Sequence, residues 1–70
     1  MSEHVYKLTE IVGTSTEGHD AAIKVALERA RKSLRNIRWF EVVAQRGYVE
    51  ADADVIHHQV TLKVGFTLDE

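Results

Sequence analysis

Residues 56–68 decide the fold, and they read I-H-H-Q-V-T-L-K-V-G-F-T-L. Apolar and polar residues alternate along this stretch, and successive side chains of a β-strand point to opposite faces of a sheet. We therefore predict a strand with one buried face and one open face. The buried face carries Ile56, His58, Val60, Leu62, Val64, Phe66 and Leu68. The open face carries His57, Gln59, Thr61, Lys63, Gly65 and Thr67.

The preceding segment predicts a hairpin partner for this strand. Residues 38–50 are rich in β-branched and aromatic types, and residues 51–54 read as the connecting turn. The residues expected to point to the core are Phe40, Val42 and Ala44. Those expected on the open face are Trp39, Glu41 and Val43. A bulge near Gly47 would exchange the faces, so the pattern leaves Arg46 and Tyr48 unassigned.

A strand and a helix are predicted ahead of this hairpin. Residues 5–12 read as a strand, and a helix is expected over about residues 19–34. Ser15 or Thr16 is expected to cap the helix, and Asn36 suits a left-handed turn after its end. The apolar stripe of the helix consists of Ile23, Leu27, Ala30 and Leu34, widened by Ala22 and Ala26.

The element order is therefore β-α-β-β, which predicts an α+β fold with a three-stranded antiparallel sheet and one helix. We expect the helix to cover one face of the sheet and the other face to stay open, as antiparallel sheets often allow. That open face is polar apart from one indole. Its expected side chains are Trp39, Glu41, Gln59, Thr61 and Lys63.

Length and composition limit the classes of function. Seventy residues predict one domain, residues 1–70, that buries only about 60% of the surface of its unfolded chain. No cysteine is available to staple so small a core, so we expect oligomerisation to support it. The net charge of −2 argues against nucleic-acid and membrane-surface partners. The missing cysteines and the lack of a signal-like segment at residues 1–4 favour the cytoplasm.

Three familiar kinds of site are not indicated. The glycines at positions 13 and 18 have the spacing of a phosphate-binding loop, but His19 and Asp20 follow where that loop needs Lys and Ser or Thr, so this segment is interpreted as a strand-to-helix turn. The four histidines show no metal-ligand spacing, and His57 and His58 face opposite sides of a strand. There is no nucleophile elbow and no evident carboxylate pair. We therefore expect neither an enzyme nor a bound metal.

Trp39 and Gln59 form the most informative pair on the predicted open face. An indole offers a flat surface for stacking, and a carboxamide offers one acceptor and two donors side by side. Together they suit a flat aromatic ligand with a polar edge. An alternative is that Trp39 is buried between subunits without any ligand. A third hypothesis stacks single-stranded nucleic acid on Trp39 and Tyr48, and the acidic balance of the chain disfavours it.

Several stretches, spread over nearly the whole chain, resemble the dodecins, small flavin-binding proteins of bacteria and archaea. The matching stretches are residues 10–15 (EIVGTS), 20–23 (DAAI), 39–42 (WFEV), 46–47 (RG) and 58–66 (HQVTLKVGF). The chain is similar to the bacterial branch of the family. This resemblance implies a sheet that wraps partly around the helix and a hollow homododecamer built from trimers.

The same resemblance implies a ligand and its site. Dodecins hold two stacked flavins at each two-fold axis, between symmetry-related tryptophans, and Trp39 stands at that tryptophan position. Gln59 stands where the family's glutamine hydrogen-bonds the isoalloxazine edge, and Arg46 matches an arginine typical of bacterial members. FMN is the expected cofactor, with riboflavin or other flavins as alternatives and coenzyme A as a further candidate. The implied function is flavin storage, buffering and photoprotection, because a stacked indole quenches the excited flavin.

One position departs from the pattern of the family. Many bacterial dodecins carry arginine between the final Phe and Leu, where this chain has Thr67. If that arginine helps to hold the phosphate of FMN, the preference for FMN over riboflavin is weakened here. Lys7 and Lys63 are the residues that could supply the missing charge.

Overall fold

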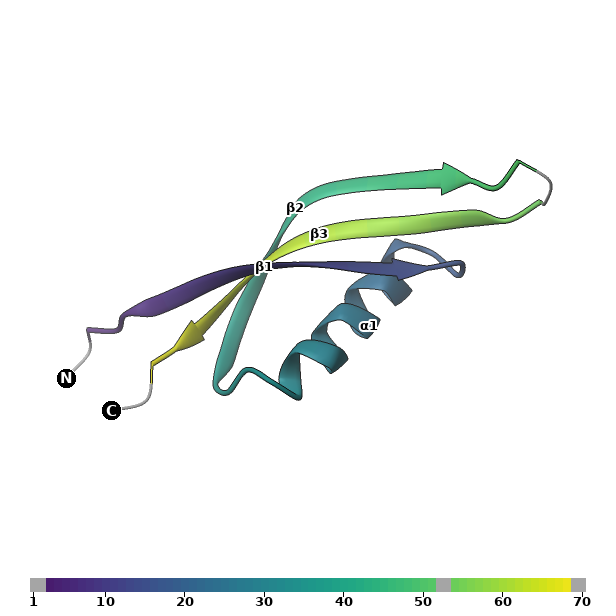
Figure 1. Cartoon of the computed structure of the whole chain (residues 1–70). Coiled ribbons are helices and arrows are strands. Elements are labelled where there is room, and N and C mark those ends of the chain that lie inside the picture. The colour runs from purple at the N-terminus through teal and green to yellow at the C-terminus, as the bar shows by residue number, and fades with distance from the viewer. Residues whose placement is uncertain (1–2, 52–53, 69–70) are drawn as a thin grey trace.

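The computed structural model describes residues 3–51 and 54–68. Its elements follow one another as β1 (Tyr6–Ser15), α1 (His19–Arg31), β2 (Ile37–Val49) and β3 (Ile56–Thr67). The strands form one antiparallel sheet in the order β1-β3-β2, and α1 lies on one face of it (Figure 1). The predicted β-α-β-β fold, with a three-stranded sheet wrapped around one helix, is confirmed.

The core lies between α1 and the central strand, β3. Val60, Leu62 and Val64 are fully buried, as the alternation of the sequence predicted. On the helix, the buried residues are alanines, with Ala22 and Ala26 in the same cluster. The larger residues of the predicted stripe are only partly buried around this cluster. The core is therefore small, because the buried side chains that α1 contributes to it are alanine methyl groups.

The helix lies close against β1 at Gly13. A Cβ built on this glycine would overlap the carbonyl oxygen of Ala22 and lie 2.8 Å from the Cβ of Ala26. Gly13 is thus a packing position inside a strand, since β1 continues to Ser15. The predicted turn at residues 13–18 is correspondingly shorter, because pairing with β3 runs on to the last residue of β1.

The start of α1 is capped differently from the prediction. Gly18 is the N-cap, with a φ of 138°, and none of the described side chains caps the helix. The expectation that Ser15 or Thr16 caps it was wrong. Ser15 Oγ instead accepts a hydrogen bond from the backbone N–H of Glu17 at 3.0 Å, which stabilises the turn before the helix.

The end of α1 also comes earlier than predicted. The helix ends at Arg31, three residues before Leu34, and the next residues form tight turns back onto Ala30 and Arg29. Asn36 has a φ of 64°, so its predicted left-handed conformation is confirmed. This residue sits where the chain turns into β2.

Two irregularities in β2 set which side chains face the helix. The register with β3 shifts between Ile37 and Trp39, so that Ile37 lies on the helix face and Trp39 on the open face. A second shift lies between Val42 and Ala44. Ala44 therefore opposes Thr61 on the open face, and the expectation that it points to the core was wrong. An extra residue in a strand exchanges the faces beyond it.

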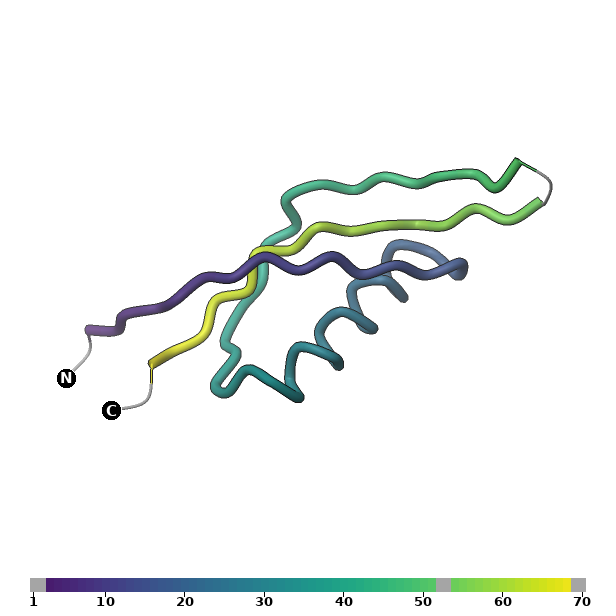
Figure 2. The backbone as a smooth tube through the Cα atoms, in the orientation of Figure 1, coloured from purple at the N-terminus to yellow at the C-terminus, as the bar shows by residue number. Residues whose placement is uncertain are grey.

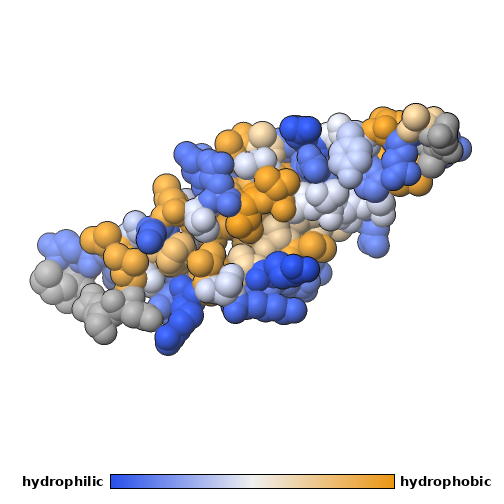
Figure 3. All heavy atoms as spheres, viewed as in Figure 1, coloured by the Kyte–Doolittle hydropathy of each residue, from blue (hydrophilic) through white to orange (hydrophobic). Residues whose placement is uncertain are grey.

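The chain is elongated and leaves apolar surface uncovered. Its radius of gyration is 14.6 Å, against about 11 Å for a compact domain of this length. The β2–β3 hairpin extends beyond the helix (Figure 2). The accessible surface of the chain is 5451 Å², which is roughly 1,000 Å² more than a compact 7.9 kDa protein exposes. Apolar side chains lie open along the strands, whereas the outer side of the helix is polar (Figure 3).

The turn between β2 and β3 is described only in part. The predicted hairpin turn at residues 51–54 includes residues 52–53, which lie outside the described residues. Across the base of this turn, the backbone N–H of Glu50 donates a hydrogen bond to the carbonyl oxygen of Val55 at 3.4 Å.

In the part of the chain that the structure describes, no helix is long and apolar enough to cross a membrane.

Candidate functional site

The candidate residues lie on the face of the sheet that is turned away from α1. Directly opposed residues of neighbouring antiparallel strands share a face, so the register defines this surface. Along β3, the opposed sets are Gly65 with Trp39 and Leu8, Lys63 with Glu41 and Glu10, Thr61 with Ala44 and Val12, Gln59 with Arg46 and Thr14, and His57 with Tyr48. We call this surface the open face.

The indole of Trp39 lies on the backbone of β3. A Cβ built on Gly65 would overlap three of its atoms, Cε2, Cζ2 and Nε1. The ring of Tyr6 meets the indole edge-on, with centroids 6.0 Å apart and an interplanar angle of 72°. The side chain is nevertheless 37% exposed. The indole of Trp39 thus packs against the backbone at Gly65 on one side and against Tyr6 at one edge, and part of its surface stays accessible to solvent.

Gln59 and Arg46 are neighbours on the same face. The two residues are directly opposed in β3 and β2. Gln59 Nε2 donates a hydrogen bond to Thr14 Oγ1 at 3.4 Å, and Gln59 is half-buried whereas Arg46 is exposed. The carbonyl oxygen of Arg46 lies 3.2 Å from His19 Nε2, at the start of α1. A carboxamide and a guanidinium therefore stand side by side, with donors for a polar ligand edge and for an anion.

A single chain does not bring Trp39 to this pair. Trp39 opposes Gly65, which is six positions from Gln59 along β3. At the rise of a β-strand this separation is about 20 Å. The indole and the carboxamide of one chain share a face, but they are too far apart to contact the same tricyclic ring.

A second aromatic pair extends the open face toward the hairpin tip. The rings of Tyr48 and His57 stack with centroids 4.5 Å apart and an interplanar angle of 6°. Glu50 Oε1 lies 2.8 Å from His57 Nε2, which donates to it. The sequence left Tyr48 unassigned because a bulge near Gly47 would have exchanged its face, whereas the structure places the irregularity between Val42 and Ala44. That Tyr48 and His57 are paired follows only from the observed register between β2 and β3.

Gly65 and Tyr6 are the other contributors that the sequence did not single out. Glycine inside a strand often marks a place where another group comes close to the backbone. That signal was present at Gly65, but nothing in the sequence named Trp39 as the group. Tyr6 lay within the predicted first strand without an assigned partner.

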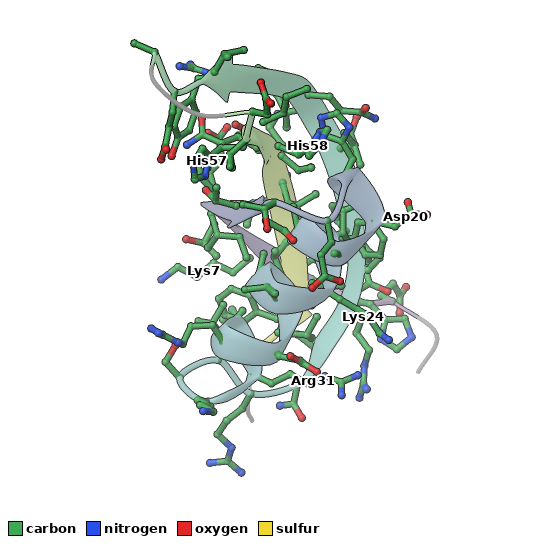
Figure 4. All side chains as sticks on the ribbon, turned by 90° about the vertical axis from the view of Figure 1, so that its right-hand side faces the viewer. Lys7, Asp20, Lys24, Arg31, His57 and His58 are labelled. Carbon is green, nitrogen blue, oxygen red and sulfur yellow. The ribbon has the colours of Figure 1, made fainter. Side chains whose placement is uncertain are left out.

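The histidines do not gather at one point. His57 and His58 emerge on opposite sides of β3 (Figure 4). The ring of His58 meets that of His19 edge-on, with centroids 4.9 Å apart. Among residues 3–51 and 54–68, no group of three or more histidine, aspartate or glutamate side chains is placed to hold a metal ion.

The two lysines named as substitutes for a missing arginine differ in their positions. Lys7 opposes Phe66, so it belongs to the face of the sheet opposite the one that carries Gln59. Lys63 lies on the open face, opposed on both sides by carboxylate residues, Glu10 and Glu41. Within one chain, Arg46 is therefore the cation that stands directly beside Gln59.

Comparison with known proteins identifies the family. The family model for Dodecin matches residues 5–69. The dodecin of Thermus thermophilus is 56% identical over 66 residues, 94% of each chain. The solved dodecin of Streptomyces davaonensis superposes with a TM-score of 0.90 at 54% identity, covering 99% of this chain and 100% of its own. The calcium dodecin of Mycobacterium tuberculosis is 36% identical over 64 residues, 91% of this chain and 89% of its own.

The chain belongs to the dodecin family. Dodecins are small flavin-binding proteins that form dodecamers and store flavin without acting as enzymes. Family membership therefore confirms both the resemblance seen in the sequence and the expectation of a protein that is not an enzyme.

Proposed function

We propose that this chain is one dodecin-like domain that binds flavin, chiefly FMN, on its open face. In this proposal, twelve copies built from trimers form a hollow shell in the cytoplasm, where it stores, buffers and photoprotects flavin. Paired flavins stack between symmetry-related copies of Trp39, and the electron-rich indole quenches their excited state. Membership of a family of flavin-binding dodecamers supports the general function.

The observation that carries the proposal is the setting of Trp39. A large aromatic side chain on an open sheet face would ordinarily be free to adopt several rotamers. Here the indole lies against the backbone at Gly65 and its edge meets the ring of Tyr6, and both contacts restrict the rotamers of Trp39. A fixed, accessible π-surface binds a planar ring without further loss of side-chain freedom.

The distances within one chain imply that two copies share each site. Gln59 and Arg46 lie about 20 Å along the strand from the indole of the same chain. A flavin stacked on Trp39 would therefore receive its polar contacts from another copy. In that arrangement, Gln59 of the neighbouring copy bonds the ring edge, and its Arg46 faces the phosphate.

Assembly is supported by the shape of the isolated chain. Its fully buried cluster is small, it is elongated, and β1 and β2 both leave one long edge unpaired. On the helix side of β2, Phe40 is 44% and Val42 is 36% exposed. Contacts between copies would bury such surface. Native mass spectrometry at micromolar protein tests the dodecamer, and a monomer there would contradict it.

A purely structural oligomer is the alternative function. Tyr6, Leu8 and Val12 are exposed apolar residues on the same open face as Trp39, which favours a protein contact there. In this alternative, Trp39 is buried at a two-fold interface without a ligand. The two functions differ in whether free flavin interacts with the assembled protein.

A fluorescence titration separates the two functions. FMN is titrated with purified, flavin-stripped protein, and riboflavin and coenzyme A are then compared in the same format. Quenching that saturates near one flavin per chain is the expected result, because each Trp39 would face one ring. Absence of quenching at micromolar protein would overturn the proposed function and leave the structural oligomer.

A further inference from the structure

A histidine at the start of α1 joins the helix to β2. His19 Nε2 lies 3.2 Å from the carbonyl oxygen of Arg46, 27 residues away in the sequence. A carbonyl oxygen can only accept, so this ring nitrogen carries the proton and donates it. The helix otherwise lies against β1 and β3, as Figure 1 shows, so this bond reaches across the sheet to an edge strand.

The ring of His19 is itself held in place. His58, on the helix face of β3, meets it edge-on with centroids 4.9 Å apart and an interplanar angle of 76°. His58 is directly opposed to Gly47, the residue after Arg46. The contact thus orients the imidazole at the point where its donor meets β2.

The bond acts on an edge strand, a few residues beyond a break in its register with β3. Arg46 follows the irregularity between Val42 and Ala44, where the ladder with β3 is disrupted, and among the described residues no strand pairs with the other side of β2. The direction in which a side chain leaves a sheet follows the rotation of its own backbone. Holding the carbonyl of Arg46 therefore also holds the direction of its guanidinium on the open face, next to Gln59.

We propose that His19 is a positioning residue that aims the guanidinium of Arg46 and thereby sets the preference for a phosphorylated flavin over an uncharged one. The inference rests on the proposed flavin-binding function. FMN and riboflavin share the ring and differ in the terminal phosphate, so the ratio of their affinities reports on Arg46 and is insensitive to stacking on Trp39. His19 would change that ratio without touching the ligand.

The test compares four proteins as full-length, flavin-stripped chains: wild type, Arg46→Ala, His19→Phe and His19→Gln. Phenylalanine keeps a ring against His58 but has no donor, whereas glutamine restores an N–H at a similar reach. Dissociation constants for FMN and riboflavin are measured by fluorescence quenching, and size-exclusion chromatography checks assembly. His19→Leu is the second variant without a donor and is measured instead if His19→Phe does not assemble.

The expected results form a pattern. Arg46→Ala lowers the ratio of FMN to riboflavin affinity about tenfold, the loss of one charge-assisted hydrogen bond. His19→Phe lowers it roughly threefold or more while riboflavin affinity stays near that of wild type, because only the aim of the cation changes. His19→Gln keeps both the ratio and the riboflavin affinity of wild type, because its side-chain N–H restores a donor to the carbonyl oxygen of Arg46.

Other results overturn the inference in recognisable ways. If Arg46→Ala lowers the ratio and His19→Phe does not, His19 has no positioning role. If His19→Phe weakens both flavins equally, its role is structural. If Arg46→Ala leaves the ratio unchanged, there is no phosphate contact to position. If wild type binds neither flavin, the proposed function fails and this inference fails with it.

Discussion

Trp39 occupies the space that a side chain at Gly65 would fill. The two residues are directly opposed, and a Cβ on Gly65 would overlap the indole. The indole of Trp39 thus packs directly against the backbone of β3. Gly65 therefore determines how close to the sheet the proposed stacking surface sits.

We expect Gly65→Ala to weaken flavin binding by displacing the indole of Trp39 from the backbone of β3. The added methyl group would push the indole away from the sheet, and overpacking of this kind typically costs about 1–3 kcal/mol. We expect a similar loss of binding free energy, measured by FMN fluorescence titration, together with a shift in the emission of Trp39. An unchanged affinity and an unchanged emission spectrum would show that Trp39 does not rest on Gly65.

Gly47→Ala is the matched control for this substitution. A Cβ there would lie 3.3 Å from the carbonyl oxygen of His57 and 3.7 Å from Ile56 Cγ2, so small shifts accommodate it. It adds the same methyl group to the same sheet, on the helix face. Because Gly47 is remote from Trp39 along the sheet, we expect the emission of Trp39 to be unchanged and the affinity for riboflavin, which has no phosphate to meet Arg46, to stay within about 0.5 kcal/mol of wild type.

Trp39→Ala is expected to remove most of the flavin affinity while leaving assembly intact. Stacking of a base on an aromatic side chain is worth about 1–3 kcal/mol per contact, and a sandwich has two faces. The dissociation constant for FMN and the native mass are measured together. Tyr48→Ala is the control, since Tyr48 is a similarly exposed aromatic on the same face. Wild-type affinity in the Trp39→Ala variant would exclude stacking on this indole.

The fold was predictable from local patterns because burial alternates along each element. The period of two in residues 56–68 marked the face that buries Val60, Leu62 and Val64. Element ends were less predictable, because they depend on partners. β1 runs on to Ser15 through pairing with β3, and α1 stops at Arg31 where turns replace helical bonds.

The site was predictable in its face but not in its distances. Alternation placed Trp39 and Gln59 on one face, which the register confirms. Whether two residues on one face are neighbours depends on counting through the irregularities of β2, and the sequence does not mark these. For this reason the separation of Trp39 from Gln59, and the adjacency of Gln59 and Arg46, emerged only from the structure.

Gln59→Ala should weaken flavin binding less than Trp39→Ala does. A neutral hydrogen bond contributes about 0.5–1.5 kcal/mol, and water can replace part of it. Thr14→Val is the control, because it removes the hydroxyl that accepts from Gln59 Nε2 and leaves the carboxamide in place. Titration of FMN with both variants should show the smaller loss for Thr14→Val. An unchanged affinity for Gln59→Ala would remove this residue from the site.

Gly13→Ala should destabilise the assembled protein through the contact between β1 and α1. The new Cβ would overlap the carbonyl oxygen of Ala22, a backbone atom inside the helix that cannot turn aside as a side chain would. The helix must move away from the sheet, at a cost of about 1–3 kcal/mol or more. Urea unfolding at one fixed protein concentration measures the loss, since subunit association contributes to stability.

Thr14→Val provides the comparison for this last substitution as well. It lies one residue further along β1, on the open face, and keeps a β-branched side chain. We expect its unfolding free energy to stay within about 0.5 kcal/mol of wild type. If Gly13→Ala unfolds at the same urea concentration as Thr14→Val, the helix does not approach β1 closely enough to require glycine. The small alanine-lined core would then tolerate a wider spacing than the structure shows.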